Sequence, residues 1–226
     1  MVARGGSKSI PQKNLALVAG RPLIAWTIEA ALRCHVVERI IVSTDDEEIA
    51  SVARSEGAET PFMRPPELAE DSTPTMPVVV HALQWLQAEE GYLPGAVVLL
   101  QPTSPLRTAD DIRTAMTLAH EHAADSVVSV SPAWSHPHLA KRITSEGLLE
   151  DFIAHPKVER RQDLEPVYAL NGAIYISRRA HLLAQQSFYG PKTYAYVMPP
   201  ERSLDVDTPW DLHLCDLILR DLYGGG

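Results

Sequence analysis

Short apolar runs alternate with longer amphipathic stretches along most of this chain. Residues 39–44, 96–100 and 125–130 are rich in branched apolar side chains and lie between charged or turn-forming residues, a pattern typical of buried strands. Apolar residues recur at helical spacing in residues 23–35, 45–57, 77–90, 108–122 and from residue 209 onward. Strands that alternate with helices predict an α/β protein in which helices cover both faces of a parallel sheet.

Capping residues predict where several helices begin. Asp45 is a candidate N-cap for the second helix, and Thr108 and Asp111 have the spacing of a capping box. Thr208 suits the N-cap of the last helix because a proline follows it. The expected buried stripe of that helix is Trp210, Leu214, Leu217 and Ile218.

The regular alternation breaks between residues 132 and 168. This stretch has scattered aromatic residues and several cations, but no clean helical period. A chain of 226 residues fits one large domain. We therefore expect a single domain over residues 1–226, in which residues 132–168 form an inserted arm.

The segment from residue 4 to residue 14 concentrates cationic and flexible residues. Gly5 and Gly6 allow a tight turn and a close approach of backbone N–H groups to a ligand. The cations of the segment are Arg4, Lys8 and Lys13. Such a loop suits a polyphosphate, although it is neither a Walker A motif nor a G-x-G-x-x-G fingerprint. A solvated basic turn is the alternative interpretation.

The positive charge near the start of the chain contrasts with an acidic remainder. Residues 1–28 contain four cationic side chains and no acidic one, whereas the whole chain has a formal net charge of −9. A local positive field in an acidic protein indicates an anionic ligand and argues against nucleic acid as a partner.

Composition also favours a cytoplasmic protein without a membrane partner. No apolar run approaches the roughly 18 residues that a membrane span requires, and residues 1–14 lack the apolar core of a signal peptide. Cys34 and Cys215 lie far apart and form no Cys-x-x-Cys motif. We expect both to be buried, reduced thiols.

Asp205 and Asp207 form a second candidate centre near the end of the chain. In an extended segment, residues i and i+2 point to the same side, so both carboxylates can face one ion. Mg²⁺ prefers oxygen ligands and commonly takes one or two carboxylates together with substrate phosphates. The Asp-x-Asp string is common in proteins, and taken alone it binds a metal in only a minority of cases.

Five segments taken together resemble one enzyme family. They are residues 4–14, Arg64–Thr75, Leu100–Arg107, Asn171–Ser177 and Asp205–Thr208. In this order and at about this spacing they are typical of CMP-sialic acid synthetases, the acylneuraminate cytidylyltransferases, and the similarity covers nearly the entire chain. The resemblance implies a three-layer αβα nucleotidyltransferase fold with a mostly parallel, Rossmann-like sheet. It also implies that CMP passes from CTP to the anomeric hydroxyl of a nonulosonic, sialic-type acid, with Mg²⁺ required and pyrophosphate released.

The resemblance assigns roles to individual side chains. The implied nucleotide-binding residues are Arg4, Gly5, Ser7, Lys8, Lys13, Asn14, Arg64, Thr73 and Thr75. The implied sugar-binding residues are Gln101, Thr103, Arg161, Asn171, Phe188 and Tyr189. The implied catalytic residues are Arg4, Lys13, Arg161 and Asp207, with Asp205 and Asp207 as metal ligands. The arm would contribute to a homodimer.

Several of these assignments have a plainer structural alternative. Arg64 would be a surface arginine if the resemblance were ignored, and Arg161 would be solvated beside Glu159 and Asp163. Phe188 and Tyr189 would by default pack in the core or in a turn.

The amino terminus is unusually short for this resemblance. Only residues 1–3 precede the cationic loop, whereas family members usually have several more apolar residues there, which form a central strand. We expect a misassigned start. A clipped chain and a shortened strand are the alternatives.

Two rival functions remain. A Kdo or other sugar nucleotidyltransferase is the nearest, although the Ser7-Lys8 and Asn171-Gly172 strings favour the sialate branch. A non-catalytic nucleotide-binding protein is the second rival, suggested by the short first strand. The cations of the loop and the two aspartates near the carboxyl terminus argue against it.

Overall fold

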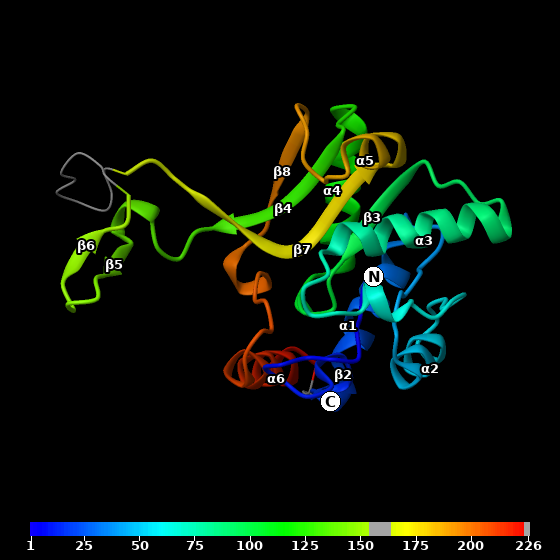
Figure 1. The fold of residues 1–226 in the computed structure, drawn as a ribbon, viewed down its shortest axis with the longest axis horizontal. Helices are drawn as coiled ribbons and strands as arrows, with labels where there is room; N and C mark the ends of the chain where they lie inside the picture. Colours follow the sequence, from blue (N-terminus) through cyan, green and yellow to red (C-terminus); the bar gives the residue numbers. More distant parts are fainter. Residues whose placement is uncertain (154–163, 224–226) are drawn as a thin grey trace.

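The computed structural model describes residues 1–153 and 164–223. Its central sheet contains β3 (Ala96–Leu100), β7 (Tyr168–Arg178), β4 (Ser126–Pro132) and β8 (Thr193–Val197), in that spatial order. Helices lie on both faces of this sheet (Figure 1). The predicted α/β architecture is therefore confirmed.

Strand direction differs from the expectation. β7 runs antiparallel to both β3 and β4, whereas β4 and β8 are parallel. The sheet is therefore mixed rather than mostly parallel. The reason is topological: β4 leads into the arm and β7 returns from it beside β4, and an antiparallel pair needs no crossover helix. Apolar periodicity carries no information on strand direction.

Alternating side chains of the sheet divide the core into two layers. Leu100 of β3 packs with residues of α1 (Leu23–Cys34) and α4 (Ala109–Glu121). Leu99 faces the opposite layer, where α3 (Thr75–Glu90) and α5 (Arg179–Gln185) contribute Leu83 and Leu182. This period of two is what a strand buried on both faces requires.

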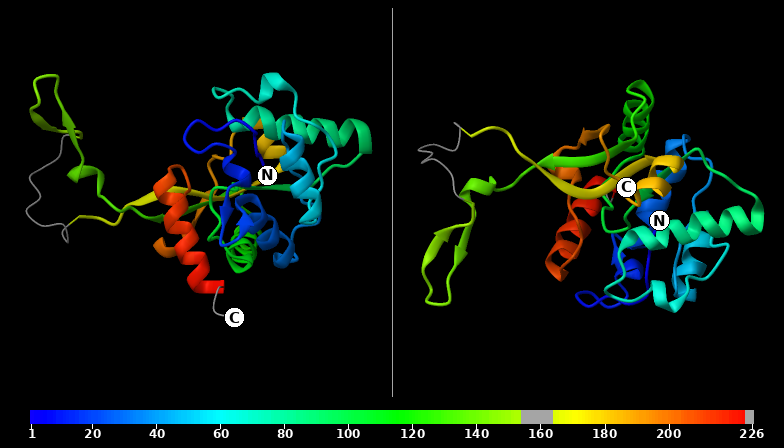
Figure 2. Two further views of the ribbon diagram at one scale, coloured as in Figure 1. Left: turned by 90° about the horizontal axis from the view of Figure 1, so that it is seen from below. Right: turned by 45° about the horizontal axis from the view of Figure 1, so that its top comes forward.

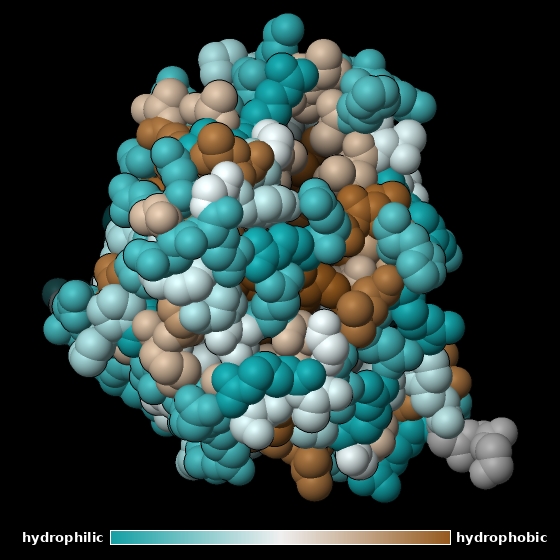
Figure 3. All heavy atoms as spheres, turned by 90° about the vertical axis from the view of Figure 1, so that its right-hand side faces the viewer, coloured by the Kyte–Doolittle hydropathy of each residue, from teal (hydrophilic) through white to brown (hydrophobic). Residues whose placement is uncertain are grey.

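The predicted strand at residues 39–44 forms isolated parallel bridges. Val2 pairs with Ser43, Ile41 with Glu59, and Thr44 with Met63. Among the described residues β3 pairs only with β7, and an apolar cavity of about 290 Å³ lies beside its other edge. Figure 3 shows apolar side chains gathered in a hollow at this end of the molecule. The expectation about the start of the chain stays a prediction.

Helix ends follow the sequence with one correction. Thr108 and Asp111 form the predicted capping box of α4. The N-cap of α2 (Glu47–Ser55) is Asp46 rather than Asp45, because the Asp46 carboxylate accepts the backbone N–H groups of residues 48 and 49. Adjacent aspartates cannot be told apart by spacing alone.

The buried stripe of α6 (Pro209–Tyr223) also differs from the prediction. Cys215 and Leu219 are buried, whereas Trp210 and Leu217 are 65% and 50% exposed. Of the predicted stripe, Ile218 does pack against the cluster that contains Leu23, Cys215 and Leu219. Tertiary packing, not periodicity, selects which face of the helix is buried.

Short elements complete the fold. They are η1 (Lys13–Leu15), β1 (Leu17–Val18), β2 (Arg21–Pro22), η2 (Pro66–Leu68), η3 (Pro137–Leu139), β5 (Lys141–Ile143), β6 (Leu149–Asp151) and η5 (Pro200–Arg202). β5 and β6 form a hairpin that projects away from the sheet on the segment between β4 and β7 (Figures 1 and 2). Within the described ranges, no helix combines the length and the hydropathy that a bilayer span requires.

Candidate active site

The two charged centres at opposite ends of the sequence meet in space. Lys13 Nζ donates to Asp207 Oδ1 and to the carbonyl oxygen of Val206, both at 2.9 Å. Lys13 opens η1, and Asp207 lies just before α6. The cationic loop and the aspartate pair therefore share one face of the molecule, as a single ligand that contacts both would require.

A cavity of about 440 Å³ opens at this meeting point. Its walls come from the amino-terminal loop, the loop before α3, the turn after β3 and the segment before α6. The predicted residues that line it are Arg4, Ser7, Lys8, Lys13, Asn14, Arg64, Thr73, Thr75, Gln101, Thr103 and Asp207. The structure thus brings predicted site residues from four distant segments of the chain together around one cavity.

Gly5 has a different role from the one predicted. Its backbone N–H donates to Asp45 Oδ1 at 3.0 Å, so this amide is not offered to a ligand. A Cβ added at Gly5 would lie 2.7 Å from Asp46 Oδ2. Gly5 therefore lets the loop approach the start of α2, while Gly6 lines the cavity.

Two loop cations share one carboxylate. Arg4 forms an ion pair with Asp71, and Lys8 Nζ lies 2.8 Å from Asp71 Oδ2. The Lys8 ammonium, together with Arg4, lowers the pKa of Asp71. Asp71 is thus ionised at neutral pH at the mouth of the cavity.

Arg64 is buried, which rules out the surface-arginine alternative. It is 6% exposed, and its Nε donates to Ser43 Oγ at 3.1 Å. Burial lowers its pKa, as does the nearby Arg4, although Asp45 opposes this effect. A buried cation in the wall of a cavity attracts an anionic or strongly polar ligand.

Asp205 and Asp207 carry the oxygen donors that a hard cation prefers. The Asp205 side chain is partly buried, and its buried Oδ1 has no hydrogen-bond partner among the described residues. Burial raises its pKa, and the hydroxyl of Thr103 opposes that shift. No set of three metal-binding side chains occurs in the described part of the chain, so Mg²⁺ here would complete its shell with water and phosphate oxygens.

Gly172, which the sequence analysis named only as part of a family string, brings β7 close to Gln101 and Asp205. Its φ is +71°, and an added Cβ would lie 2.9 Å from Gln101 Oε1 and 3.5 Å from Asp205 Oδ2. The register shift between β4 and β7 lies beside it. The available signal was a glycine inside a strand, which commonly marks a bulge or a close approach.

Asn171 and Phe188 are not free for the sugar contacts predicted for them. The Asn171 side chain accepts from Ser129 Oγ at 2.6 Å and donates to Ser203 Oγ at 3.0 Å, so it fixes the bulge of β7. Phe188 is 6% exposed and packs against Tyr175 in the core. Both residues face inward because of tertiary packing, which their sequence strings do not reveal.

The structure does not test the sugar contacts predicted for Tyr189 and Arg161. Tyr189 is about half exposed, and its contact with a sugar stays a prediction. Arg161 lies outside the described residues.

The family of the chain follows from a comparison with known proteins. The model of a cytidylyltransferase family matches residues 1–212. The chain belongs to the cytidylyltransferase family. Among its relatives, CMP-N,N'-diacetyllegionaminic acid synthase of Legionella pneumophila is 40% identical over 225 residues, which cover 96% of this chain and 94% of that protein.

Another relative of this cytidylyltransferase is longer than the chain. N-acylneuraminate cytidylyltransferase of Streptococcus agalactiae is 39% identical over 208 residues, which cover 91% of this chain and 49% of that protein. The chain thus spans about half the length of this relative. The structure of CMP:2-keto-3-deoxy-manno-octonic acid synthetase complexed with CTP shares the fold, with a TM-score of 0.70 at 17% identity over 98% of this chain and 97% of that one.

Arg107 is a further buried cation of this cytidylyltransferase that sequence reasoning missed. It is 2% exposed and donates from Nη1 to the carbonyl oxygens of Ala173, at 2.8 Å, and Gln101, at 3.3 Å. Burial lowers its pKa to about 9, although Asp111 opposes the shift. Arg107 ties the turn after β3 to β7, and so holds Gln101 beside Gly172.

Proposed function

We propose that this cytidylyltransferase transfers CMP from CTP to the anomeric hydroxyl of a nonulosonic acid and releases pyrophosphate. The observation that carries the proposal is the Lys13–Asp207 contact in the wall of the cavity. This contact supports a site in which one triphosphate touches both the cationic loop and Asp207. The names of the relatives supply the classes of nucleotide and sugar acid.

The cationic side of the cavity would hold the nucleotide. Arg4, Lys8 and Lys13 provide charge-assisted donors for phosphate oxygens. Lys13, which is only 15% exposed, would stabilise the charge that develops on the departing pyrophosphate. Arg64 and Thr75, further along the same wall, would contact the cytidine.

Asp205 and Asp207 would hold Mg²⁺. When bound there, the ion would polarise the α-phosphate and help to position the attacking hydroxyl. The buried and unpartnered Oδ1 of Asp205 supports this assignment, because a buried carboxylate oxygen without a partner is costly unless a ligand satisfies it.

The sugar acid would enter on the far side of the aspartates. Gln101 offers both a donor and an acceptor beside Gly172 and Asp205. Thr103 lies in the same turn and lines the cavity. Arg161 would neutralise the sugar carboxylate, a role that rests on the sequence resemblance alone.

A substrate panel tests the proposal. Pyrophosphate release is measured with CTP, Mg²⁺ and, in turn, a sialic, a legionaminic, a pseudaminic and a Kdo-type acid. We expect turnover with at least one nonulosonic acid, and none with the Asp207→Ala variant, which still binds CTP. Preference for Kdo would favour the first rival function. CTP binding without pyrophosphate release from any acid would favour a non-catalytic protein.

We also propose a cytoplasmic homodimer assembled through the arm. Its described part exposes several large apolar side chains: Trp134, Ile143, Leu149 and Phe152 are each more than 60% exposed. Large apolar side chains exposed on one projecting segment are the kind of surface that a partner subunit could cover. The two buried cysteines carry free thiols, which suits a reducing compartment.

A further inference from the structure

Asp71 occupies the cationic end of the cavity. Its carboxylate pairs with Arg4 and with Lys8. Neither cation has another ion pair among the described residues. The Asp71 carboxylate therefore already contacts Arg4 and Lys8, the two cations that would bind nucleotide phosphates.

The contact between the two loops consists of these ion pairs. In the ranges that the structure describes, no backbone hydrogen bond joins residues 4–14 to residues 64–75. The loop that carries Asp71 is held by its own turns, for example by the Thr73 N–H to the Glu70 carbonyl at 3.1 Å. Asp71 can therefore leave the cations without breaking a backbone hydrogen bond between the two loops.

Charge decides which ligands can replace Asp71. The side chains of Lys8 and Asp71 are 81% and 42% exposed, and exposed ion pairs are weak. A β,γ-diphosphate group carries more negative charge than one carboxylate and so competes well for Arg4 and Lys8. A nucleoside monophosphate lacks the β- and γ-phosphates and therefore has less negative charge with which to displace Asp71 from both cations.

We infer that Asp71 is a specificity-determining residue: a tethered anion that competes with the β- and γ-phosphates and returns to Arg4 and Lys8 as pyrophosphate leaves. This inference rests on the proposed function for the identity of the ligand. It explains why an acidic side chain lies in a site built for an anion. Asp71 favours triphosphate over monophosphate and helps to release pyrophosphate.

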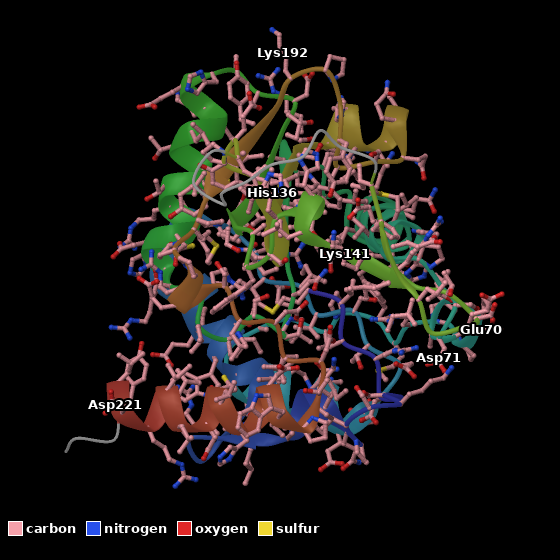
Figure 4. All side chains as sticks on the ribbon, turned by 90° about the vertical axis from the view of Figure 1, so that its left-hand side faces the viewer. Glu70, Asp71, His136, Lys141, Lys192 and Asp221 are labelled. Carbon is pink, nitrogen blue, oxygen red and sulfur yellow. The ribbon has the colours of Figure 1, made fainter. Side chains whose placement is uncertain are left out.

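Binding measurements on Asp71→Asn test the inference. CTP, inorganic pyrophosphate and CMP are each titrated into the wild type and the variant by calorimetry, first in the presence of a chelator and then with Mg²⁺. We expect the variant to bind CTP and pyrophosphate about three- to tenfold more tightly and CMP equally well. Because Asp71 is exposed at the rim of the molecule (Figure 4), the substitution should not disturb folding.

Glu67→Gln is the matched control. Glu67 is an exposed acidic residue of the same loop that does not line the cavity and has no ion pair within the described ranges. This variant should bind all three ligands like the wild type. In a Lys8→Gln background the gain from Asp71→Asn should shrink, because one of the two contested cations is gone.

Other outcomes would overturn the inference. Unchanged or weaker CTP binding by Asp71→Asn, while the wild type binds CTP, contradicts it and leaves the proposed function standing. A loss of affinity that occurs only with Mg²⁺ would make Asp71 a metal ligand instead. A wild-type protein that binds neither CTP nor pyrophosphate would overturn the proposed function and this inference together.

Discussion

At the residue scale, Gly172 sets the spacing between Gln101 and Asp205. Gly172 has a positive φ, and a methyl group added there would lie 2.9 Å from Gln101 Oε1, so the Gln101 amide would have to move. Gln101 is in turn held through the Arg107 contact to its carbonyl oxygen. A small shift at this point should affect transfer more than nucleotide binding.

The Gly172→Ala variant tests whether a shift at this position affects transfer more than nucleotide binding. We expect kcat to fall about 10- to 100-fold, because small misplacements of reacting groups are costly, while CTP affinity measured by calorimetry stays unchanged. Gly91→Ala is the control: its φ is +64°, but nothing lies within 4 Å of its added Cβ. An equal loss of activity in both variants would mean that backbone strain, not contact with Gln101, is responsible.

Lys13→Gln tests the cationic side. The variant removes the charge that contacts Asp207, so kcat in the pyrophosphate assay should fall by about 10²–10³-fold. Lys192→Gln is the control, since Lys192 lies at the far end of the molecule from the site (Figure 4). Turnover within about twofold of the wild type would remove Lys13 from the set of residues that stabilise the reaction.

The charged residues were predictable, but several neutral ones were not. Arg4, Lys13 and Asp207 could be predicted as lining residues of a cavity because a charged side chain is costly to bury without solvent or an oppositely charged partner. A neutral side chain can instead be buried with partners inside the protein: Asn171 accepts a hydrogen bond from Ser129, and Phe188 packs in the core. Asp71 was missed because an acidic residue argues against an anion site when the sequence is read alone.

At the scale of elements, one buried network connects α4, β8 and the segment before the aspartates. Asp111, which is 1% exposed, accepts from Arg202 Nε and Nη2 at 3.0 and 2.9 Å and from the Tyr196 hydroxyl at 2.8 Å. Burial alone would raise the pKa of Asp111, but these donors, with Thr108, lower it below its ordinary value of 3.8.

Asp111→Asn should therefore destabilise the protein in a pH-dependent way. At pH 7 we expect a loss of about 2–4 kcal/mol in the free energy of unfolding. A lowered folded-state pKa stabilises the wild type above pH 4, and this contribution is lost as the pH falls through the folded-state value. Urea unfolding at several pH values should show the two proteins converge in acid. A constant difference down to pH 3 would contradict this.

Element positions were predicted better than element relations. The helices of residues 23–34, 75–90 and 109–121 match their apolar periodicity because each buries one face. The direction of β7 and the buried face of α6 could not be predicted, since both depend on which neighbour each element meets.

At the scale of the whole molecule, the arm carries the prediction of a dimer. Replacing Ile143 and Phe152 together by aspartate should shift the sedimenting species from a dimer toward the 24.9 kDa monomer, because both side chains are exposed and apolar. Glu146→Ala, at the exposed turn of the same hairpin, is the control. A wild-type protein that is itself monomeric at micromolar concentration would contradict the proposal.

The sequence alone determined the chemistry of this protein and the order of its elements. Charge, glycine placement and apolar period are local properties, and they predicted a polyphosphate loop, a carboxylate pair and an α/β fold. Tertiary structure alone decided which groups meet: the contact of Lys13 with Asp207, the approach of Gly172 to Gln101 and the seat of Asp71 between Arg4 and Lys8. The physical reason is that these contacts join residues far apart in the chain, and only the packing of the layers fixes the distances between them.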